Sequence, residues 1–462
     1  MNTTSNSSAA LRTMAEYTGQ PYLVVSTDAH AGPSPERHLR PYCPEKFLPD
    51  FDEYCRASRA TAERSNAALR TALAAKGAVP TLGDFGREGV ARCVDCDGHH
   101  DPHVRLRHMD DSGVAAEVVF AGGQNFEELP FMGKGWNAGP AGVRGELRTM
   151  AGWIWNRWIA DYTSVSPHRL LGVLQTPVWD VDAAVREIEW GAEHGIRVVN
   201  LPAPRRDFPA YTDPVYDRLW SACAATGAVL VTHSAGGEEP LGIEGRRGRF
   251  LQIIENHWLG NRGLAQLIFG GVFHRHPNLK FVLTEQRVEF APDLIRHLDS
   301  CYVAGLHTEH TGAGVHPAAP FLLEPADVDP DPDSPDALPR RPSEYWATNC
   351  FLSGSFLARY EVALRHAVGL TNLMWGSDYP HVEGTWPYTT HAIRHTFADV
   401  PEDESRLILG ETAVGVYGLD RRVLAPIADR VGPSVALVKT PLTDTELALS
   451  HGGAFRQFGT YA

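Results

Sequence analysis

The feature that most constrains this chain is a repeated alternation of short apolar runs and longer helical patterns. Eight runs rich in β-branched residues alternate with segments that have the periodicity of amphipathic helices. Parallel βα units produce this kind of alternation. The eight predicted strands begin at Tyr22, Ala115, Leu170, Ile196, Ala228, Leu279, Trp346 and Asn372.

Eight such pairs predict an α/β fold, a (β/α)8 or TIM barrel spanning residues 21–420. The helical segment after the third strand illustrates the pattern, because Asp180 can cap its start and Gly195 its end. A doubly wound open sheet is the rival architecture. No GxGxxG or Walker phosphate loop follows any predicted strand to support that rival.

Three stretches fall outside the regular pattern of the barrel. Residues 1–20 form a polar N-terminal segment, and residues 31–104 form an insert too long for a plain connection, so we predict a cap or lid. The acidic, proline-rich segment that begins at Glu324 is predicted to be a mobile surface loop. Residues 421–462 form a C-terminal extension that packs on the barrel or on a partner subunit.

Composition excludes several classes of function. The formal net charge of the 462 residues is -14, which argues against nucleic acid as the partner because that would need a basic face. No apolar stretch approaches the roughly 20 residues that span a bilayer, so no membrane association is expected. The polar N-terminus has no signal-peptide pattern, and the seven cysteines are expected to be reduced thiols. We therefore expect a cytoplasmic enzyme with a small-molecule substrate.

Ionisable residues stand where four of the predicted strands end. They are Asp28 and His30, His233, Glu285 and Asp378. Asp28 and His30 are two apart, so they share one face of a strand. Any one of these residues is more often a cap or turn residue, but barrel closure brings all four strand ends to one mouth.

Two imidazoles and two aspartates can hold one divalent ion and leave a position open for water or substrate. The large share of oxygen ligands favours Mn, Fe or Mg over a thiolate site, and Zn is also compatible. The sequence therefore predicts one divalent metal ion as the cofactor.

Several motifs resemble those of a known family, the amidohydrolase-related metal-dependent enzymes, in the branch that includes aminocarboxymuconate-semialdehyde decarboxylase. The motifs are "TDAH", "VTHSAGG", "FHRHPNLKFVLTE" and "MWGSDYPHVEGTWP", and the likeness covers about residues 20–420. The resemblance implies that Asp28, His30, His233 and Asp378 bind the metal, that Asp378 also moves protons, and that the chain forms a homodimer. Asp28 replaces the first histidine of the usual HxH pair, and Glu285 replaces a histidine on the sixth strand.

Hydrolysis is the reaction that we expect first. A bound metal lowers the pKa of water to about 7, and Asp378 is the candidate base for hydrolysing a small organic carbonyl or carboxylate compound. The alternative on the same site is a non-oxidative decarboxylase. A substrate carboxylate would then meet the like charge of Glu285, unless Glu285 is protonated or Arg287 supplies a cation. A non-catalytic ligand-binding barrel is a third possibility.

The role of Glu285 has several interpretations. It is a candidate catalytic residue, as a second base, but it could also be a fifth metal ligand or a partner of Arg287 at the rim.

Substrate contacts are expected in the loops at the mouth of the barrel. Arg287, His381 and Trp386 are candidate substrate-binding residues, and Glu383 and His257 are weaker ones. Each could instead be a packing residue.

A second metal-like motif lies in the insert. "CVDCDGHHDPH" contains Cys93 and Cys96 at a zinc-like spacing, with His99, His100 and His103 close behind. The second half of a zinc site usually lies a dozen or more residues away, so a loop with free thiols is the competing interpretation.

Overall fold

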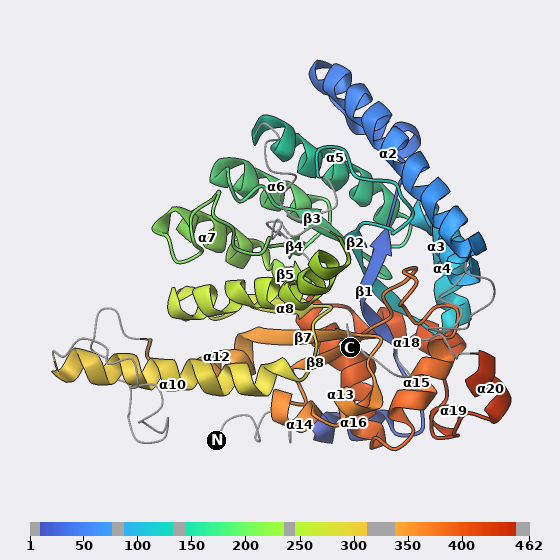
Figure 1. Cartoon of the computed structure of the whole chain (residues 1–462). Helices are drawn as coiled ribbons and strands as arrows, with labels where there is room; N and C mark the ends of the chain where they lie inside the picture. The colour runs from blue at the N-terminus through green and yellow to red at the C-terminus, as the bar shows by residue number, and fades with distance from the viewer. Residues whose placement is uncertain (1–9, 76–86, 133–144, 235–244, 312–337, 450–462) are drawn as a thin grey trace.

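Eight parallel strands in sequential order form the centre of the molecule. The computed structural model describes residues 10–75, 87–132, 145–234, 245–311 and 338–449. Each strand pairs with the next, and an isolated parallel bridge between Ala29 and Tyr379 joins the two edges. Figure 1 shows the strands at the centre with helices around them. The strands are β1 (Val25–Ala31), β2 (Ala116–Ala121), β3 (Leu170–Gln175), β4 (Val198–Asn200), β5 (Val229–His233), β6 (Lys280–Thr284), β7 (Cys350–Ser355) and β8 (Leu373–Gly376).

The sequential order confirms the predicted barrel and excludes the doubly wound sheet, which would need a reversal of strand order. Six of the predicted strands coincide closely with observed ones, and the first was placed three residues too early, since β1 begins at Val25 rather than at Tyr22. The seventh was placed too early, because residues from Trp346 to Asn349 belong to helix α12 (Pro342–Asn349). At the start of that helix, the Glu344 side chain accepts a hydrogen bond from the Arg341 backbone amide. This contact caps the N-terminus of α12 and stabilises the helical conformation there.

Helices cover the outside of the barrel. Two apolar clusters follow from strand alternation: alternate residues such as Val173 and Val231 fill the interior, and their neighbours such as Leu174 and Leu230 pack against helices. The covering helices after β2 to β6 are α5 (Gly145–Ser164), α6 (Val181–Glu193), α7 (Asp217–Thr226), α8 (Gly245–Phe269), α9 (Val272–Arg275) and α10 (Phe290–Thr311). Helix α6 is capped by Asp180 as predicted, because the Asp180 carboxylate accepts from the Ala183 amide at 3.0 Å.

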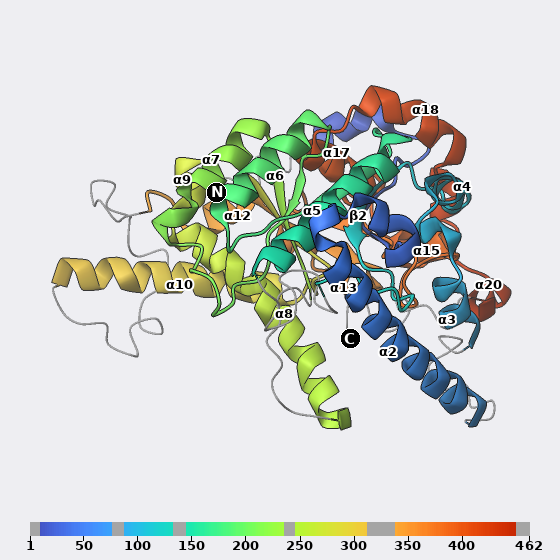
Figure 2. The same cartoon turned by 90° about the horizontal axis from the view of Figure 1, so that it is seen from above.

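The described residues between β1 and β2 contain three α-helices and several shorter helical turns. The α-helices are α2 (Leu48–Ala75), α3 (Arg87–Val94) and α4 (Pro102–Ser112). Figure 2 shows α2 and α8 projecting from the same side of the barrel. Asp101 caps the start of helix α4, because its side chain accepts from the backbone amides of His103 and Val104. This helix leads directly into β2.

The last part of the chain closes one end of the barrel. Leu424 and Ala428 belong to the apolar cluster inside the barrel, and Tyr22 donates its amide to the Pro433 carbonyl at 3.0 Å. The described part of the extension therefore packs on its own barrel. The helices from β7 onward are α13 (Arg359–Val362), α14 (Arg365–Val368), α15 (Thr389–Phe397), α16 (Glu402–Arg406), α17 (Thr412–Tyr417), α18 (Arg421–Val431), α19 (Val435–Val438) and α20 (Asp444–Leu449).

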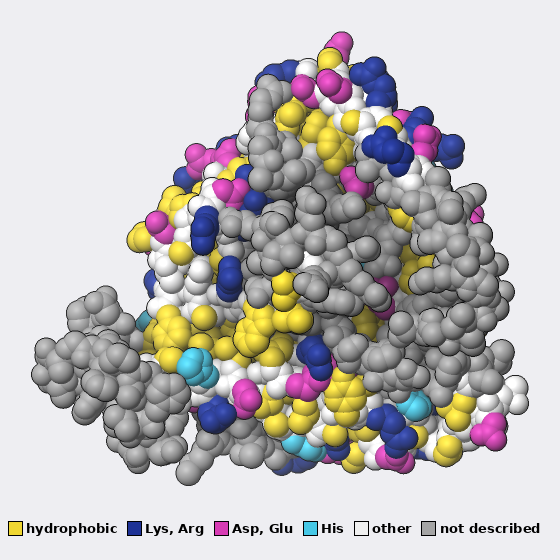
Figure 3. Space-filling model, viewed as in Figure 1, with side chains coloured by type: hydrophobic (Ala, Val, Ile, Leu, Met, Phe, Trp, Pro, Cys, Tyr) yellow, Lys and Arg dark blue, Asp and Glu magenta, His cyan; other side chains and the backbone are white. Residues whose placement is uncertain are grey.

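The described surface carries charges of both signs. On the face seen in Figure 3, Lys and Arg side chains lie scattered among Asp and Glu side chains. None of the described helices is long and apolar enough to cross a bilayer. The proline-rich segment that begins at Glu324 falls, up to residue 337, outside the described residues.

Candidate metal centre at the barrel mouth

The first strand carries a bulge that directs two ligand-type side chains to the mouth. The register with β2 shifts between Ser26 and Ala29, so three residues of β1 span two of β2. Asp28 and His30 follow on one face, as the alternation predicted, and the His30 Nε2 lies 3.3 Å from the Asp28 Oδ1. Both residues lie within β1 rather than beyond its end.

The fifth and eighth strands bring the other two predicted ligands to the same place. The Nε2 of His233 lies 3.4 Å from the Asp28 Oδ1, and the Asp378 Oδ1 lies 3.1 Å from the His30 Nε2. The backbone holds these residues as well, since the Asp378 amide donates to the Asp28 carbonyl at 2.9 Å. We call Asp28, His30, His233 and Asp378 the mouth cluster.

The mouth cluster has the donor set and the burial of a metal site. All four side chains are at most 3% exposed. Among the described residues, the ion-pair partners of Asp28 and Asp378 are histidines, and the Asp28 Oδ1 and both Asp378 carboxylate oxygens accept no hydrogen bond. Buried carboxylate oxygens are costly unless something compensates them, and a cation would do so. The residues present therefore fit a divalent ion.

His381 lies beside the mouth cluster and was predicted only as a substrate contact. Its Nδ1 is 2.9 Å from the Asp378 Oδ1, and its ring stacks on that of His30. Ligand atoms of His30, Asp378 and His381 lie close enough together to hold one ion. The spacing of His381 three residues after Asp378 was the available signal for this placement.

Electrostatics within the cluster shift several pKa values. Burial lowers the pKa of His30 to about 4, although Asp28 opposes the shift. Burial acts in the same direction on His233, but the carboxylates of Glu285 and Asp28 raise its pKa to about 9. Burial and the charges of Glu285 and Asp28 hold the pKa of Asp378 well above its usual range. Three carboxylates thus share a small volume, a situation that a bound cation relieves.

Glu285 lies against His233, and one of its carboxylate oxygens lies within 4.8 Å of carboxylate oxygens of Asp28 and Asp378, close enough for the three to hold one ion. Its Oε2 accepts a hydrogen bond from the Ser234 hydroxyl at 2.6 Å and lies 3.4 Å from the His233 Nδ1. Burial raises the pKa of Glu285 to about 7. The His233 Nδ1 is also 2.8 Å from the Ser234 carbonyl, which assigns the proton to Nδ1 and turns Nε2 toward Asp28.

Arg287 pairs with Glu289 in the structure. Its Nη2 lies 2.6 Å from the Glu289 Oε1, and both side chains are partly exposed. Glu285, by contrast, is 2% exposed and oriented by Ser234 and His233. The buried position places Glu285 with the mouth cluster rather than with an ion pair on the rim.

Both candidate catalytic carboxylates sit on a left-handed backbone. The φ angles are 53° at Glu285 and 55° at Asp378. Residues other than glycine rarely adopt this conformation, which costs about 1 to 3 kcal/mol and is concentrated at functional sites. Among the described residues, Gln124, Phe126, Phe131 and Phe356 share this conformation, so it agrees with a functional role for Glu285 and Asp378 but does not single them out.

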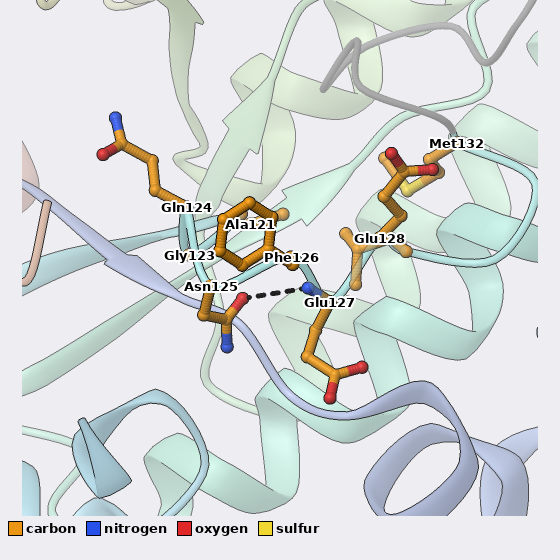
Figure 4. A pocket seen from close by; sticks show the side chains of 10 residues that line it. Ala121, Gly123, Gln124, Asn125, Phe126, Glu127, Glu128 and Met132 are labelled. Carbon is orange, nitrogen blue, oxygen red and sulfur yellow. Dashed lines mark hydrogen bonds between the residues drawn. The ribbon is translucent and has the colours of Figure 1, made fainter. Parts of the chain in front are cut away.

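A cavity of about 310 Å³ begins where β2 ends. Figure 4 shows the side chains that line it, from the segment Ala121–Met132. Phe120, one residue before this segment, lies with its ring centroid 5.0 Å from that of His233 and 6.0 Å from that of His30. Phe120 thus connects the cavity segment to the mouth cluster, while the described lining of the cavity contains none of the four cluster residues.

Glu383 holds this cavity loop in place. The Gln124 side chain donates to the Glu383 Oε1 at 2.7 Å, and the side-chain Nδ2 of Asn125 donates to the Gly32 carbonyl at 2.8 Å. The loop is therefore attached both to the segment after β1 and to the segment after β8. Glu383, the weakest of the predicted substrate contacts after strand eight, serves here as an anchor.

The remaining predicted substrate contacts lie elsewhere. Trp386 packs edge-on against Tyr379 and over His108, with centroid distances of 5.3 and 4.9 Å. It lines a second cavity of about 390 Å³ between α3 and α4. Position 257 lies in α8, and its side chain is outside the described part of the structure.

Cys93 and Cys96 each have a separate partner. The Cys93 thiol donates to the Gly123 carbonyl, the Cys96 sulfur lies 3.0 Å from the Tyr379 hydroxyl, and the His99 Nε2 lies 2.8 Å from the Cys93 carbonyl. His100 stacks on another ring, at 4.3 Å from His38. In the described ranges, no group of three metal-capable side chains includes these residues. This geometry favours free thiols over a zinc site.

Sequence reasoning did not identify two buried hydroxyls beside the cluster. Ser355, at the end of β7, donates its hydroxyl to the Asp28 Oδ2. The Ser26 hydroxyl oxygen lies 2.9 Å from the Ser377 hydroxyl oxygen and accepts a hydrogen bond from the Ser377 backbone amide. Ser355 could have been predicted from the sequence, because strand alternation places it on the inner face of β7. Ser26 could not, because the bulge in β1 interrupts the alternation there.

Comparison with known proteins identifies a family to which the sequence is similar. A family model described as "Amidohydrolase" matches residues 94–419. No curated protein matches the chain.

Solved structures share the fold at low sequence identity. The 5-carboxyvanillate decarboxylase of Sphingomonas paucimobilis is 20% identical over 86% of this chain and 100% of its own, with a TM-score of 0.52. That of Novosphingobium aromaticivorans, with bound manganese and 3-methoxy-4-hydroxy-5-nitrobenzoic acid, is 15% identical over 86% and 97%, with a TM-score of 0.56. An amidohydrolase from Mycobacterium avium subsp. paratuberculosis is 17% identical over 86% and 99%, with a TM-score of 0.54.

Proposed function

The chain belongs to the amidohydrolase family, and on that premise we propose that it is a metal-dependent, non-oxidative decarboxylase of small aromatic carboxylic acids. The observation that carries this proposal is the buried mouth cluster of carboxylates and imidazoles, which Phe120 connects to a cavity segment. Two of the similar structures carry the name of a decarboxylase, and one of these holds manganese with a nitrobenzoic acid. Decarboxylation therefore takes precedence over the hydrolysis that the sequence alone favoured.

The proposed ligands are the four residues of the mouth cluster, with His381 as a further donor. A divalent ion held there supplies positive charge that binds the substrate anion and withdraws electron density from it. Manganese is our first choice, because half of the cluster's ligands are carboxylates and because the similar decarboxylase structure contains it.

A side chain of the protein then donates one proton to the substrate. In a decarboxylation, the ring carbon that bears the carboxylate gains a proton, the bond to that carboxylate breaks, and carbon dioxide leaves as the electron pair returns to the ring. Asp378 is the proposed donor of this proton, since its carboxylate lies at the centre of the cluster. The Ser234 carbonyl orients His233 through Nδ1, and Glu285 adds a negative charge 3.4 Å from the same nitrogen and is close enough to Asp28 and Asp378 to be a further ligand.

The substrate ring is proposed to occupy the cavity lined by the segment Ala121–Met132. This cavity is about 310 Å³ in volume and contains the apolar side chains of Phe126, Leu129 and Met132. A pocket with an apolar lining and a few polar groups suits a small aromatic ring. Glu127 and Glu128 in the same lining favour ring substituents that donate hydrogen bonds.

Hydrolysis is the second candidate, because one similar structure carries the name amidohydrolase and the same carboxylates could accept a proton from water. One experiment separates the two reactions. The protein reconstituted with Mn²⁺ is incubated with a panel of hydroxy- and amino-substituted benzoic acids and with a panel of aryl esters and amides. We expect carbon dioxide and the decarboxylated arene; hydrolysis of the second panel without carbon dioxide from the first would contradict the proposal.

A further inference from the structure

A fully buried ion pair lies next to the mouth cluster, on the side of α4. The Arg105 Nε, from α4, lies 2.8 Å from the Glu117 Oε2 on β2, and the two side chains are 0% and 2% exposed. Burying two opposite charges gains little over packing two apolar side chains of similar size. Stability alone is therefore a weak reason for this pair.

The rest of the Arg105 guanidinium contacts the seam where the first and last strands close the barrel. Its Nη1 donates to the His30 carbonyl at 2.7 Å, and its Cζ lies over the Tyr379 ring, 4.8 Å from the centroid. The same two residues form the seam, since the His30 amide donates to the Tyr379 carbonyl at 2.6 Å. Arg105 thus contacts the chain on both sides of the closure, next to His30 and Asp378.

The Tyr379 ring is itself held on its far side. Its hydroxyl lies 2.8 Å from the His108 Nδ1 and 3.0 Å from the Cys96 sulfur. Because the ring is fixed there, a cation over its face can fix the backbone of Tyr379. Tyr379 directly follows Asp378, so the position of the Asp378 carboxylate depends on this arrangement.

We propose that Arg105, oriented by Glu117, is a positioning residue that sets the spacing between His30 on β1 and Asp378 after β8, and thereby the metal affinity of the mouth cluster. The inference rests on the proposed function only in requiring that the cluster binds a divalent ion. His30 and Asp378 belong to the first and last strands, so their spacing depends on how these two strands meet. Contacts such as those of Arg105 hold that spacing, because small displacements of ligands weaken metal binding.

Arg169 offers a matched control. It is 8% exposed, pairs with Asp110 at 2.8 Å, and donates to the backbone carbonyls of Val114 and Ala115. These carbonyls precede β2, at the opposite end of the strand from the mouth. Arg169 therefore makes the same kinds of contact as Arg105, at a place where no cluster ligand depends on them.

The test compares Mn²⁺ affinity and unfolding free energy in three variants of the full chain. Arg105→Met/Glu117→Leu removes both charges of the pair. Arg105→Lys keeps the positive charge but removes the planar guanidinium and its several N–H donors. Arg169→Met is the control. Mn²⁺ binding to the metal-free protein is titrated with electron paramagnetic resonance detection of the free ion. Unfolding of the metal-free protein is followed in urea.

We expect the double variant to weaken Mn²⁺ binding by about 10- to 100-fold, with an unfolding free energy close to that of the wild type. Arg105→Lys, which keeps the buried charge paired with Glu117, should also bind more weakly. Arg169→Met should lose stability and keep wild-type affinity.

Wild-type Mn²⁺ affinity in the double variant would overturn the inference. If the double variant does not fold, wild-type affinity in Arg105→Lys would do so instead. An equal loss of Mn²⁺ affinity in Arg169→Met would also overturn it. Failure of the wild type itself to bind Mn²⁺ would overturn the proposed metal centre together with the inference. Binding without decarboxylation would contradict the proposed reaction alone.

Discussion

The imidazole of His381 stacks on that of His30, with ring centroids 3.9 Å apart and ring planes 10° apart. The same ring presents its Nδ1 to Asp378 at 2.9 Å. His381 therefore contacts one proposed ligand through its face and another through its edge. This arrangement makes His381 a further candidate ligand of the proposed metal centre, although its place in the chain suggested only a contact with substrate.

Substitution of His381 tests this assignment. His381→Phe keeps an aromatic ring that can stack on His30 and removes the nitrogen that faces Asp378. We expect the Mn²⁺ dissociation constant to rise about tenfold, because one contact to the ligand set is lost while the packing stays. If the KM for substrate rises while Mn²⁺ affinity is unchanged, His381 is a substrate contact as the sequence first indicated.

Asp378 is the proposed proton donor, and its amide variant should separate chemistry from folding. Asp378→Asn preserves the size of the buried side chain and removes the transferable proton. We expect kcat to fall by about 100-fold or more, with an unchanged circular dichroism spectrum. Near-normal turnover in this variant would rule out Asp378 as the donor.

Glu285 has a matched neighbour for comparison. In Glu285→Gln the negative charge beside the His233 Nδ1 is lost, and with it a further candidate ligand, so we expect Mn²⁺ affinity to fall about tenfold. Glu289→Gln is the control, since Glu289 pairs with the partly exposed Arg287. Equal behaviour of the two variants would show that Glu285 has no special role.

Much of this site could be predicted because strand alternation is a strict rule. Asp28 and His30 were expected on one face, and the closed barrel brings His233 and Asp378 to them. The same rule accounts for the eight parallel strands in sequential order. The fold and the grouping of these four side chains thus follow from the periodicity of the apolar runs, while their role as metal ligands is a proposal.

The contacts around the ligands could not be predicted in the same way. The bulge at Ser26 and the stack of His381 on His30 depend on local backbone geometry that no periodic pattern encodes. The Arg105–Glu117 pair joins a helix of the insert to β2, and a single sequence cannot reveal which helical arginine meets a buried glutamate. The Trp346 helix was taken for a strand for a related reason, because its aromatic and apolar residues suit both structures.

Stability should depend on pH through Glu361, which lies away from the metal centre. Glu361 is fully buried, accepts a hydrogen bond from the Ala358 amide, and burial raises its pKa from the usual 4.5 to about 8. Between these values the folded protein binds the proton and the unfolded chain does not. The free energy of unfolding should therefore fall as pH rises through this interval, by at most about 1.4 kcal/mol per pH unit.

Urea unfolding at a series of pH values measures this dependence. In Glu361→Gln the fall in stability between about pH 5 and about pH 8 should become shallower. Glu193→Gln replaces an exposed glutamate of α6 and should leave the wild-type profile unchanged. A wild-type slope in Glu361→Gln would mean that another group carries the pH dependence.

The metal content of the reconstituted protein tests the central claim most directly. Wild-type chain and the variant Asp28→Asn/Asp378→Asn are loaded with Mn²⁺, freed of excess metal by gel filtration and assayed by mass spectrometry of the metal. The account predicts about one equivalent of Mn²⁺ per wild-type chain and less than about one tenth of an equivalent in the folded double variant. Less than about one tenth of an equivalent in the wild type, or a full equivalent in the double variant, would contradict it.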